Sequence, residues 1–275
     1  MRIMTYNLLN DHPKFAGIPS KNWADRSPYV LKHIDLLDPD ILAIQEGSPS
    51  QIKVIKAAFP NFEYYGPQAG GNYGGEQVGI FYDKTQFGVL NKGTFWLSKT
   101  PEQCSKDWGA GHHRICTWLQ LHEQQTGTTF FHLNTHLEAK KEEVRVQQIR
   151  VILDKIATWV HQNPTSAIVL TGDLNASDKS GVYRAITNTN LNDAFVSAKT
   201  KKNSLRYTFV GINKKWTWTK LLLHVFYPDY MHKRLDHIFV SSALSVEYYE
   251  ISNWSYNNLY PSDHWPILVK IKSIC

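Results

Sequence analysis

Cysteine is scarce in this 275-residue chain, and the three cysteines fit neither a disulfide framework nor a zinc site. Cys104, Cys116 and Cys275 form an odd-numbered set without the paired spacing that such frameworks need. We therefore expect free thiols. The sequence also has no HExxH motif and no CxxC cluster, so the usual zinc signatures are excluded.

Long hydrophobic runs are missing as well. The sequence has no stretch of about 18 apolar residues, the length that a membrane-spanning helix needs. The first residues, MRIMTYNLLN, follow a strand pattern at once and do not resemble a secretory signal. These features predict a soluble protein, either cytoplasmic or a processed secreted form, for which only peripheral contact with lipid is left open.

The composition is that of an ordinary globular protein, with 42% hydrophobic and 20% charged residues. Proline- or serine-rich linkers, low-complexity tracts and internal repeats are absent, so we predict one domain over residues 1–275 and a monomer. Lysine and arginine outnumber the acidic residues by 30 to 24, a net charge of +6. Such a modest excess permits a nucleic-acid partner without requiring one.

Strand and helix patterns alternate along the chain. Apolar runs predict strands at residues 2–9, 40–46, 77–83, 114–121, 128–136, 167–175, 234–241 and 264–271. Helical patterns occur at residues 26–37, 49–59 and 140–160. In the last of these, apolar residues recur at steps of three and four and form one face, which we assign to the core. The pattern predicts a mixed α+β fold.

Polar side chains follow several of the predicted strands. In the segment IVLTGDLN, a buried strand ends in a glycine, Asp173 and Asn175; a plain turn is the alternative, since these are common turn residues. Other apolar runs border on Asn7, Glu46, His136, Asp263 and His264. If the strands lie side by side, these groups form one cleft rim. Carboxylate and amide oxygens favour Mg²⁺ or Mn²⁺ over zinc.

Seven short segments occur in an order that resembles the endonuclease/exonuclease/phosphatase superfamily, and in particular its bacterial-type branch. They are YNLL with Asn7, QE with Glu46, RICTW with Arg114, NTH with His136, GDLN with Asp173 and Asn175, RLDHIFVS with Asp236, and SDH with Asp263 and His264. The resemblance implies a four-layer α/β sandwich, with two packed mixed β-sheets flanked by helices. It also implies hydrolysis of a phosphoester by metal-activated water.

The resemblance gives the acidic residues their roles. Glu46 would be the principal ligand of Mg²⁺, or of Mn²⁺, with Asn7 beside it and Asp263 completing the metal environment. Asp173 would orient and deprotonate the attacking water. A capped strand end is the structural alternative for Glu46, and a turn for Asp173.

The remaining matched residues would face the phosphate. Asp236 would orient His264 against the phosphate and make its imidazole more basic. Asn175, His136 and Arg114 would hold phosphate oxygens, and His136 could also donate to the leaving group. The structural alternatives are a buried histidine for His136 and a surface ion pair for Arg114.

Two features depart from the family's familiar members. Abasic-site nucleases of the superfamily carry an aspartate two residues after the first asparagine, where this sequence has Leu9, so an abasic-site repair role is not supported. The glycine-rich residues 70–75 precede a strand and predict a mobile loop, with Glu76 as a possible cleft residue. His112 and His113 lack a motif and are expected to be bystanders.

Substrate choice is left open by the sequence. An aromatic and basic insertion around residues 199–233 could stack on bases, dip into a lipid interface, or simply pack on the body of the protein. The favoured function is a nuclease or a nucleotide-directed phosphodiesterase. The alternatives are a sphingomyelin or other phospholipid phosphodiesterase, a phosphoinositide phosphatase, and a non-catalytic binding protein of the same fold.

Overall fold

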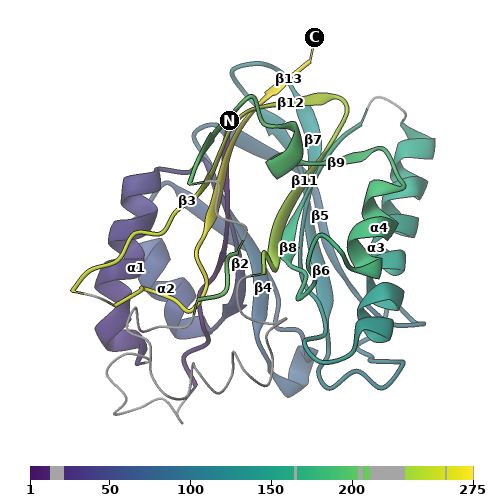
Figure 1. Cartoon of the computed structure of the whole chain (residues 1–275), viewed down its shortest axis with the longest axis horizontal. Helices are drawn as coiled ribbons and strands as arrows, with labels where there is room; N and C mark the ends of the chain where they lie inside the picture. The colour runs from purple at the N-terminus through teal and green to yellow at the C-terminus, as the bar shows by residue number, and fades with distance from the viewer. Residues whose placement is uncertain (13–21, 164–165, 204–206, 211–232, 258, 275) are drawn as a thin grey trace.

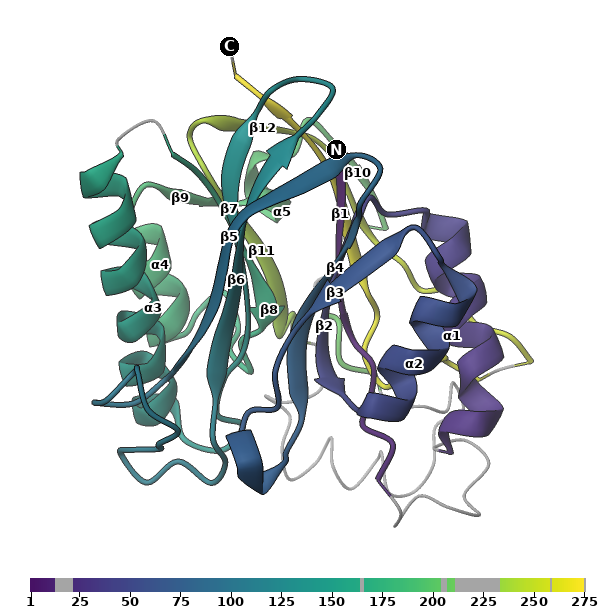
Figure 2. The same cartoon turned by 180° about the vertical axis from the view of Figure 1, so that it is seen from behind.

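The computed structural model describes residues 1–12, 22–163, 166–203, 207–210, 233–257 and 259–274. Two β-sheets stack face to face, and helices cover both outer faces (Figure 1 and, from behind, Figure 2). Helices α1 (Trp23–Leu37) and α2 (Pro49–Ala58) lie outside the first sheet. Helices α3 (Glu142–Gln162) and α4 (Gly181–Thr187) lie outside the second. The predicted four-layer sandwich is confirmed.

The first sheet has seven strands in the order β10-β12-β13-β1-β2-β4-β3. Its strands are β1 (Arg2–Asn7), β2 (Ile41–Gly47), β3 (Phe62–Tyr65), β4 (Gln77–Asp83), β10 (Thr200–Lys202), β12 (Leu244–Ile251) and β13 (Ile267–Ser273). β1 is parallel to β2 and antiparallel to β13, so the first and last strands of the chain lie side by side at the centre of the sheet. The ends of β1 and β2 therefore lie at the same edge.

The second sheet has six strands in the order β5-β6-β7-β8-β11-β9. Its strands are β5 (Phe87–Trp96), β6 (Ile115–Glu123), β7 (Thr129–His136), β8 (Ala167–Asp173), β9 (Leu191–Asp193) and β11 (Asp236–Ser241). β7 and β8 are parallel and end together, with His136 paired to Asp173. β11 runs antiparallel to β8, which sets Asp236 opposite Asp173. Short helices η2 (Gly71–Tyr73) and α5 (Ala194–Ser197) complete the described elements.

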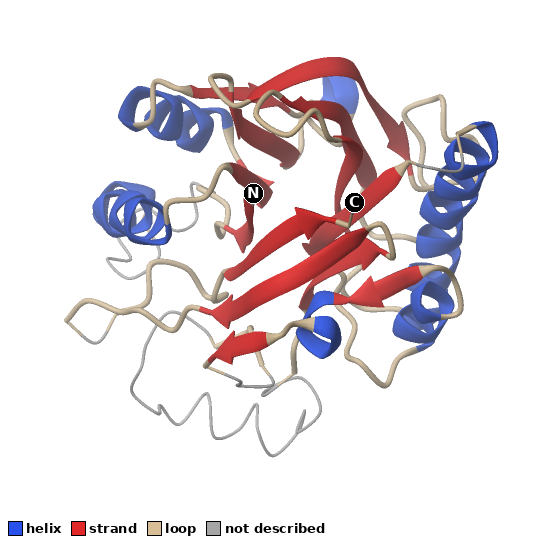
Figure 3. Ribbon diagram, turned by 90° about the horizontal axis from the view of Figure 1, so that it is seen from above, coloured by secondary structure: helices blue, strands red, loops and turns tan. Residues whose placement is uncertain are grey.

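Apolar side chains fill the space between the layers. Figure 3 shows the strands and the helices outside them from above. Ile3, Ile80 and Val169 belong to the cluster between the two sheets, and two further clusters pack beneath the helices on either side. The predicted apolar face of α3 is confirmed, because Val144, Ile149, Ile152 and Ile156 are all buried. Each sheet thus packs against apolar side chains on both faces, which keeps the residues at its strand ends in fixed positions.

All eight predicted strands and all three predicted helices are found, but five strands were not predicted, β3, β5, β9, β10 and β12. Three of these have only three or four residues. β5 is longer, yet its centre is exposed and polar, so it lacks the apolar run that identifies a buried strand. Most of the predicted insertion at 199–233 lies outside the described residues.

Two further expectations concern the thiols and the membrane. Cys104 and Cys116 are free, as predicted. Within the part of the chain that the structure describes, no helix is long and apolar enough to cross a bilayer.

Candidate active site

The ends of β1 and β2 bring an amide and a carboxylate to the edge of the first sheet. Asn7 is completely buried, and its amide nitrogen donates to Glu46 Oε1 at 3.0 Å and to Asp173 Oδ2 at 3.1 Å. Its amide oxygen accepts a hydrogen bond from the Leu9 backbone at 3.0 Å. Asn7 therefore joins a carboxylate of the first sheet to a carboxylate of the second.

Asp173 ends β8 at the facing edge of the second sheet, with only 1% of its surface exposed. Its Oδ1 accepts the backbone N–H of Asn175 at 2.9 Å, and the Asn175 side chain donates to the Leu137 carbonyl at 3.1 Å. Gly172 precedes Asp173 with a φ of 153°, and a Cβ there would lie 2.1 Å from the Thr135 carbonyl oxygen. The strand end that aims Asp173 thus requires glycine.

Replacing Gly172 with alanine should lower the free energy of unfolding by at least about 2 kcal/mol, because backbone of β7 blocks the added methyl group. The measurement is urea-induced unfolding. Gly88→Ala, in β5, is the matched control, since a Cβ at that glycine meets no atom within 4 Å. Equal stabilities of the two variants would contradict this explanation of the glycine.

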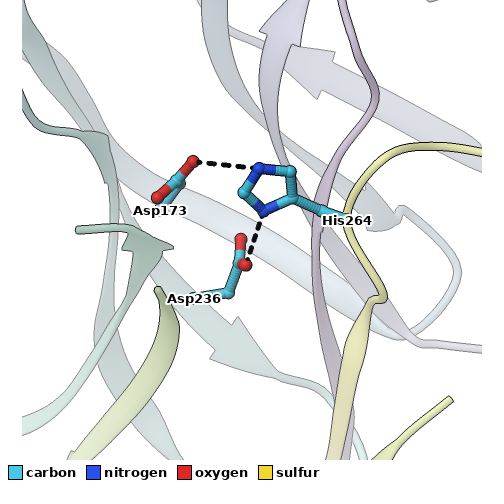
Figure 4. Close-up of side chains that lie close together, drawn as sticks. All are labelled: Asp173, Asp236 and His264. Carbon is cyan, nitrogen blue, oxygen red and sulfur yellow. Dashed lines mark hydrogen bonds and ion pairs between the residues drawn. The ribbon is translucent and has the colours of Figure 1, made fainter. Parts of the chain in front are cut away.

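Asp236 and His264 form a buried pair beside Asp173 (Figure 4). His264 Nδ1 donates to Asp236 Oδ2 at 2.7 Å, and His264 Nε2 lies 3.7 Å from Asp173 Oδ2. Ligand atoms of these three residues all lie within 4.8 Å of one another. The short contact within the pair is a hydrogen bond, and it fixes which imidazole nitrogen faces Asp173.

A second acid–histidine pair, Glu76 and His136, faces the same oxygen of Asp173. His136 Nδ1 donates to Glu76 Oε2 at 3.0 Å, and His136 Nε2 lies 3.6 Å from Asp173 Oδ2. The other oxygen of Glu76 is bound by Arg114, whose side chain is 6% exposed. Glu76 was predicted only as a possible cleft residue; its place between a glycine run and a strand gave no sign of these two partners.

The buried charges shift one another's protonation. Burial alone would raise the pKa of Asp173, but the nearby His264 and His136 lower it. Burial would lower the pKa of His264, yet Asp236 and Asp173 raise it well above its usual value. In the same way, Arg114 and His136 outweigh burial and bring the pKa of Glu76 down to about 2. At neutral pH Asp173 is therefore ionised and faces the cationic imidazole of His264.

Glu46 and Asp263 are the carboxylates that would hold a hard divalent cation, whereas the described residues whose ligand atoms lie within 4.8 Å of one another are Asp173, Asp236 and His264. Burial and the negative charge of Glu46 raise the pKa of Asp263, and the positive charges of His264 and Arg26 oppose that rise. The two carboxylates, Glu46 and Asp263, are therefore close enough to repel each other. Carboxylate oxygens of this kind are the preferred ligands of Mg²⁺ and Mn²⁺. Of the two carboxylates, the Asn7 amide nitrogen orients Glu46, and its second hydrogen bond goes to Asp173.

Glu46, Glu76, Arg114 and His136 line a cleft of about 760 Å³, whereas Asp173, Asp236 and His264 are buried and are not among its lining residues. The lining also includes Lys106, His112 and His113, so the structure brings to the cleft two histidines that the sequence suggested were bystanders. Their neighbours in the sequence form no motif, and only the fold reveals their position.

Arg26 is a supporting residue that the sequence did not single out. Although it lies in the helix α1, it is 3% exposed, and its guanidinium donates to the carbonyls of Leu8, Leu9 and Pro261 at 2.7–2.8 Å. These carbonyls belong to the segments after β1 and before β13, which carry Asn7 and His264. An arginine within an amphipathic helix pattern is the only signal that could have identified it.

Solved structures of similar shape cover almost the whole chain. A mannosyl-6-phosphatase from Bacteroides thetaiotaomicron has a TM-score of 0.89 and 28% identity, over 99% of both chains. D. rerio TDP2 complexed with a single-stranded DNA product has a TM-score of 0.75 and 20% identity, over 99% of both chains. The second likeness, at this identity, concerns the fold alone.

Among curated proteins, the RNA exonuclease NGL1 of Saccharomyces cerevisiae is 22% identical over 240 residues, which is 65% of this chain and 64% of that protein. Protein angel of Drosophila melanogaster is 27% identical over 190 residues, 63% of this chain and 50% of that protein. The chain thus spans between half and two thirds of these relatives. The model of the endonuclease/exonuclease/phosphatase family matches residues 4–264, nearly the whole chain. The chain therefore belongs to the endonuclease/exonuclease/phosphatase family, whose members are metal-dependent hydrolytic phosphoesterases.

Proposed function

We propose that the protein is a Mg²⁺-dependent phosphatase that removes the phosphate from a small phosphorylated molecule, such as a sugar phosphate. The observation that carries this proposal is the convergence of Asn7, Glu46 and Asp173 through two hydrogen bonds, with the two acid–histidine pairs around them. A cleft of about 760 Å³ is in the range of small-molecule sites, roughly 300–1,000 Å³.

In this proposal, Glu46 and Asp263 would hold the cation, and Asn7 would keep Glu46 in place. A bound divalent cation supplies positive charge that offsets the negative charge on the phosphate oxygens. Phosphate esters react very slowly in water, so the site must neutralise charge on both the attacking and the leaving side.

Side chains of the protein would activate the water and bind the phosphate. Asp173, which is ionised, accepts a hydrogen bond from the attacking water and takes its proton. His264, held by Asp236, is cationic and donates to a phosphate oxygen. His136 Nε2 and His264 Nε2 lie 3.6 and 3.7 Å from Asp173 Oδ2, longer than a hydrogen bond. In this proposal, both imidazoles would instead donate to the phosphate.

Arg114 and His136 would bind the remaining phosphate oxygens. Arg114 is a permanent cation, and burial strengthens its attraction for a dianion. Asn175 would add an amide donor next to Asp173. Lys106, on the lining of the cleft, gives the entrance a further positive charge that suits an anionic substrate.

Nucleic acid is the second candidate. Support comes from the net charge of +6 and from the relative named as an RNA exonuclease. The first candidate is favoured because the mannosyl-6-phosphatase is similar over 99% of both chains, whereas the exonuclease is aligned over only 65% of this one. Lipid substrates have no comparable support in the described residues.

A substrate panel tests the proposal. Mannose 6-phosphate, single-stranded DNA, RNA, sphingomyelin and a phosphoinositide should be assayed side by side, with Mg²⁺ and with EDTA. We expect release of inorganic phosphate from the sugar phosphate to be fastest, and to be lost in EDTA. Faster cleavage of DNA or RNA would favour the second candidate, and hydrolysis that is equally fast in EDTA would contradict the metal's role.

A further inference from the structure

The two halves of the candidate site come from different sheets. The first sheet supplies Asn7 and Glu46, and the second supplies His136 and Asp173. The distance between the halves therefore depends on how one sheet is docked on the other. Apolar packing between sheets is not directional, whereas a hydrogen bond fixes both a distance and an angle.

Asn134, on β7, reaches across this interface with three hydrogen bonds. Its side chain is fully buried between the sheets. The amide nitrogen donates to the carbonyl oxygens of Ile44 on β2, at 2.8 Å, and Gly79 on β4, at 2.9 Å. The amide oxygen accepts from Gln45 Nε2 at 2.7 Å. One side chain thus joins the second sheet to two neighbouring strands of the first.

These contacts lie beside a β-bulge in β2, and Glu46, which lines the cleft, lies within this bulge. Ile44 and Gly79 are the last paired residues before the register of β2 against β4 shifts, and pairing resumes between Gly47 and Gln77. Glu46 lies within this bulge, with a φ of 57° that is costly for a residue other than glycine. A β-bulge redirects a side chain, and here Asn134 holds the backbone where the bulge begins.

Further polar groups connect Asn134 to the other strands of the site. Gln45 Nε2 also donates to Thr5 Oγ1 on β1 at 3.0 Å, and Thr171 Oγ1 on β8 lies 3.3 Å from Asn134 Oδ1. Each of these polar residues stands one or two positions before a site residue of its own strand: Thr5 before Asn7, Gln45 before Glu46, Asn134 before His136, and Thr171 before Asp173.

We propose that Asn134 is a positioning residue, which sets the separation between Glu46 on one sheet and Asp173 and His136 on the other. It touches neither substrate nor cation and acts through Gln45 and the bulge. The proposal rests on the proposed phosphoesterase function, since it concerns the geometry that the reaction needs. A displacement of about 1 Å in such a site can lower a rate by about a hundredfold.

The test replaces Asn134 with leucine, which has a similar size and no hydrogen-bonding groups. We expect kcat to fall by at least about tenfold while KM changes by less than about threefold, because the reacting groups shift relative to one another. Gln45→Met removes the bond at 2.7 Å and leaves the two carbonyl contacts, so it should lower kcat less. It also serves as the test variant if Asn134→Leu does not fold.

Ser241→Ala is the matched control. The Ser241 hydroxyl accepts the backbone N–H of Ile168 at 3.0 Å, at the ends of β11 and β8 that lie opposite Asp236 and Asp173 and away from the bulge. We expect this variant to lose thermal stability and to keep kcat within about twofold. If Asn134→Leu and Gln45→Met also lose only stability and keep kcat, the positioning role is overturned.

A crystal structure of Asn134→Leu separates this inference from the proposed function. We expect Glu46 to move away from Asp173, with loss of at least one of the two hydrogen bonds that Asn7 makes to them. If both bonds are unchanged, the inference fails, whichever substrate the enzyme hydrolyses. If Glu46 moves and the wild-type protein hydrolyses no phosphoester, the proposed function fails and the structural inference stands.

Discussion

Replacing Glu46 with glutamine is expected to lower phosphoester hydrolysis by at least about a hundredfold. Glutamine has the size of glutamate, and its one side-chain oxygen can still accept a hydrogen bond from either Asn7 or the Asn10 backbone. It lacks the negative charge that attracts a divalent cation. The measurement is the initial rate of phosphate release at saturating Mg²⁺, with circular dichroism to show that the fold is intact.

Glu63→Gln is the matched control for this substitution. Glu63 lies on β3 of the same sheet and forms ion pairs with Lys56 and Lys84, far along the sheet from the end of β2. We expect wild-type activity from it. An active Glu46→Gln enzyme would show that this carboxylate is not needed for the reaction.

Replacing His264 with alanine should also lower the rate by at least about a hundredfold. The substitution removes a cationic group that faces Asp173, and it leaves the Asp236 carboxylate buried without its hydrogen-bond partner. The loss should be seen mainly in kcat, because the imidazolium stabilises charge that develops on the phosphate in the transition state.

Two further variants accompany His264→Ala: Asp236→Asn tests the partner of His264, and His122→Ala is the control. The asparagine variant keeps the imidazole but weakens its orientation, so its rate should fall between those of wild type and His264→Ala. His122 lies on β6 next to the end of that strand, and its imidazole bonds to the Thr129 hydroxyl at 3.4 Å, so His122→Ala should be fully active. A His264→Ala rate equal to that of His122→Ala would remove His264 from the mechanism.

The sequence predicted the fold because buried strands leave a strong local pattern. The strand β8, seven buried residues ending in Asp173, is the clearest case. The strands that were missed leave no such pattern: the edge strand β5 is half exposed, and β12, between β10 and β13, contains a register shift between Val246 and Tyr248. Their place in the sheets is decided by pairing with distant partners, which periodicity within one segment cannot report.

The candidate site was found from residues at strand ends, and the structure brings those residues together. Their mutual contacts could not be predicted, because they join positions up to 166 residues apart, as in the bond from Asn7 to Asp173. Asn134 shows the limit most clearly. It lies within a motif that was attributed to His136, and only the stacking of the two sheets reveals what its amide binds.

The rate of phosphate release as a function of free Mg²⁺, measured for the wild type and for Glu46→Gln after removal of metal with EDTA, tests the central claim most directly. We expect the wild type to be inactive without metal and to regain full activity on titration, and Glu46→Gln to need much more Mg²⁺ or to stay inactive. Identical titration curves for the two proteins, or a wild-type rate that does not depend on metal, would contradict the account.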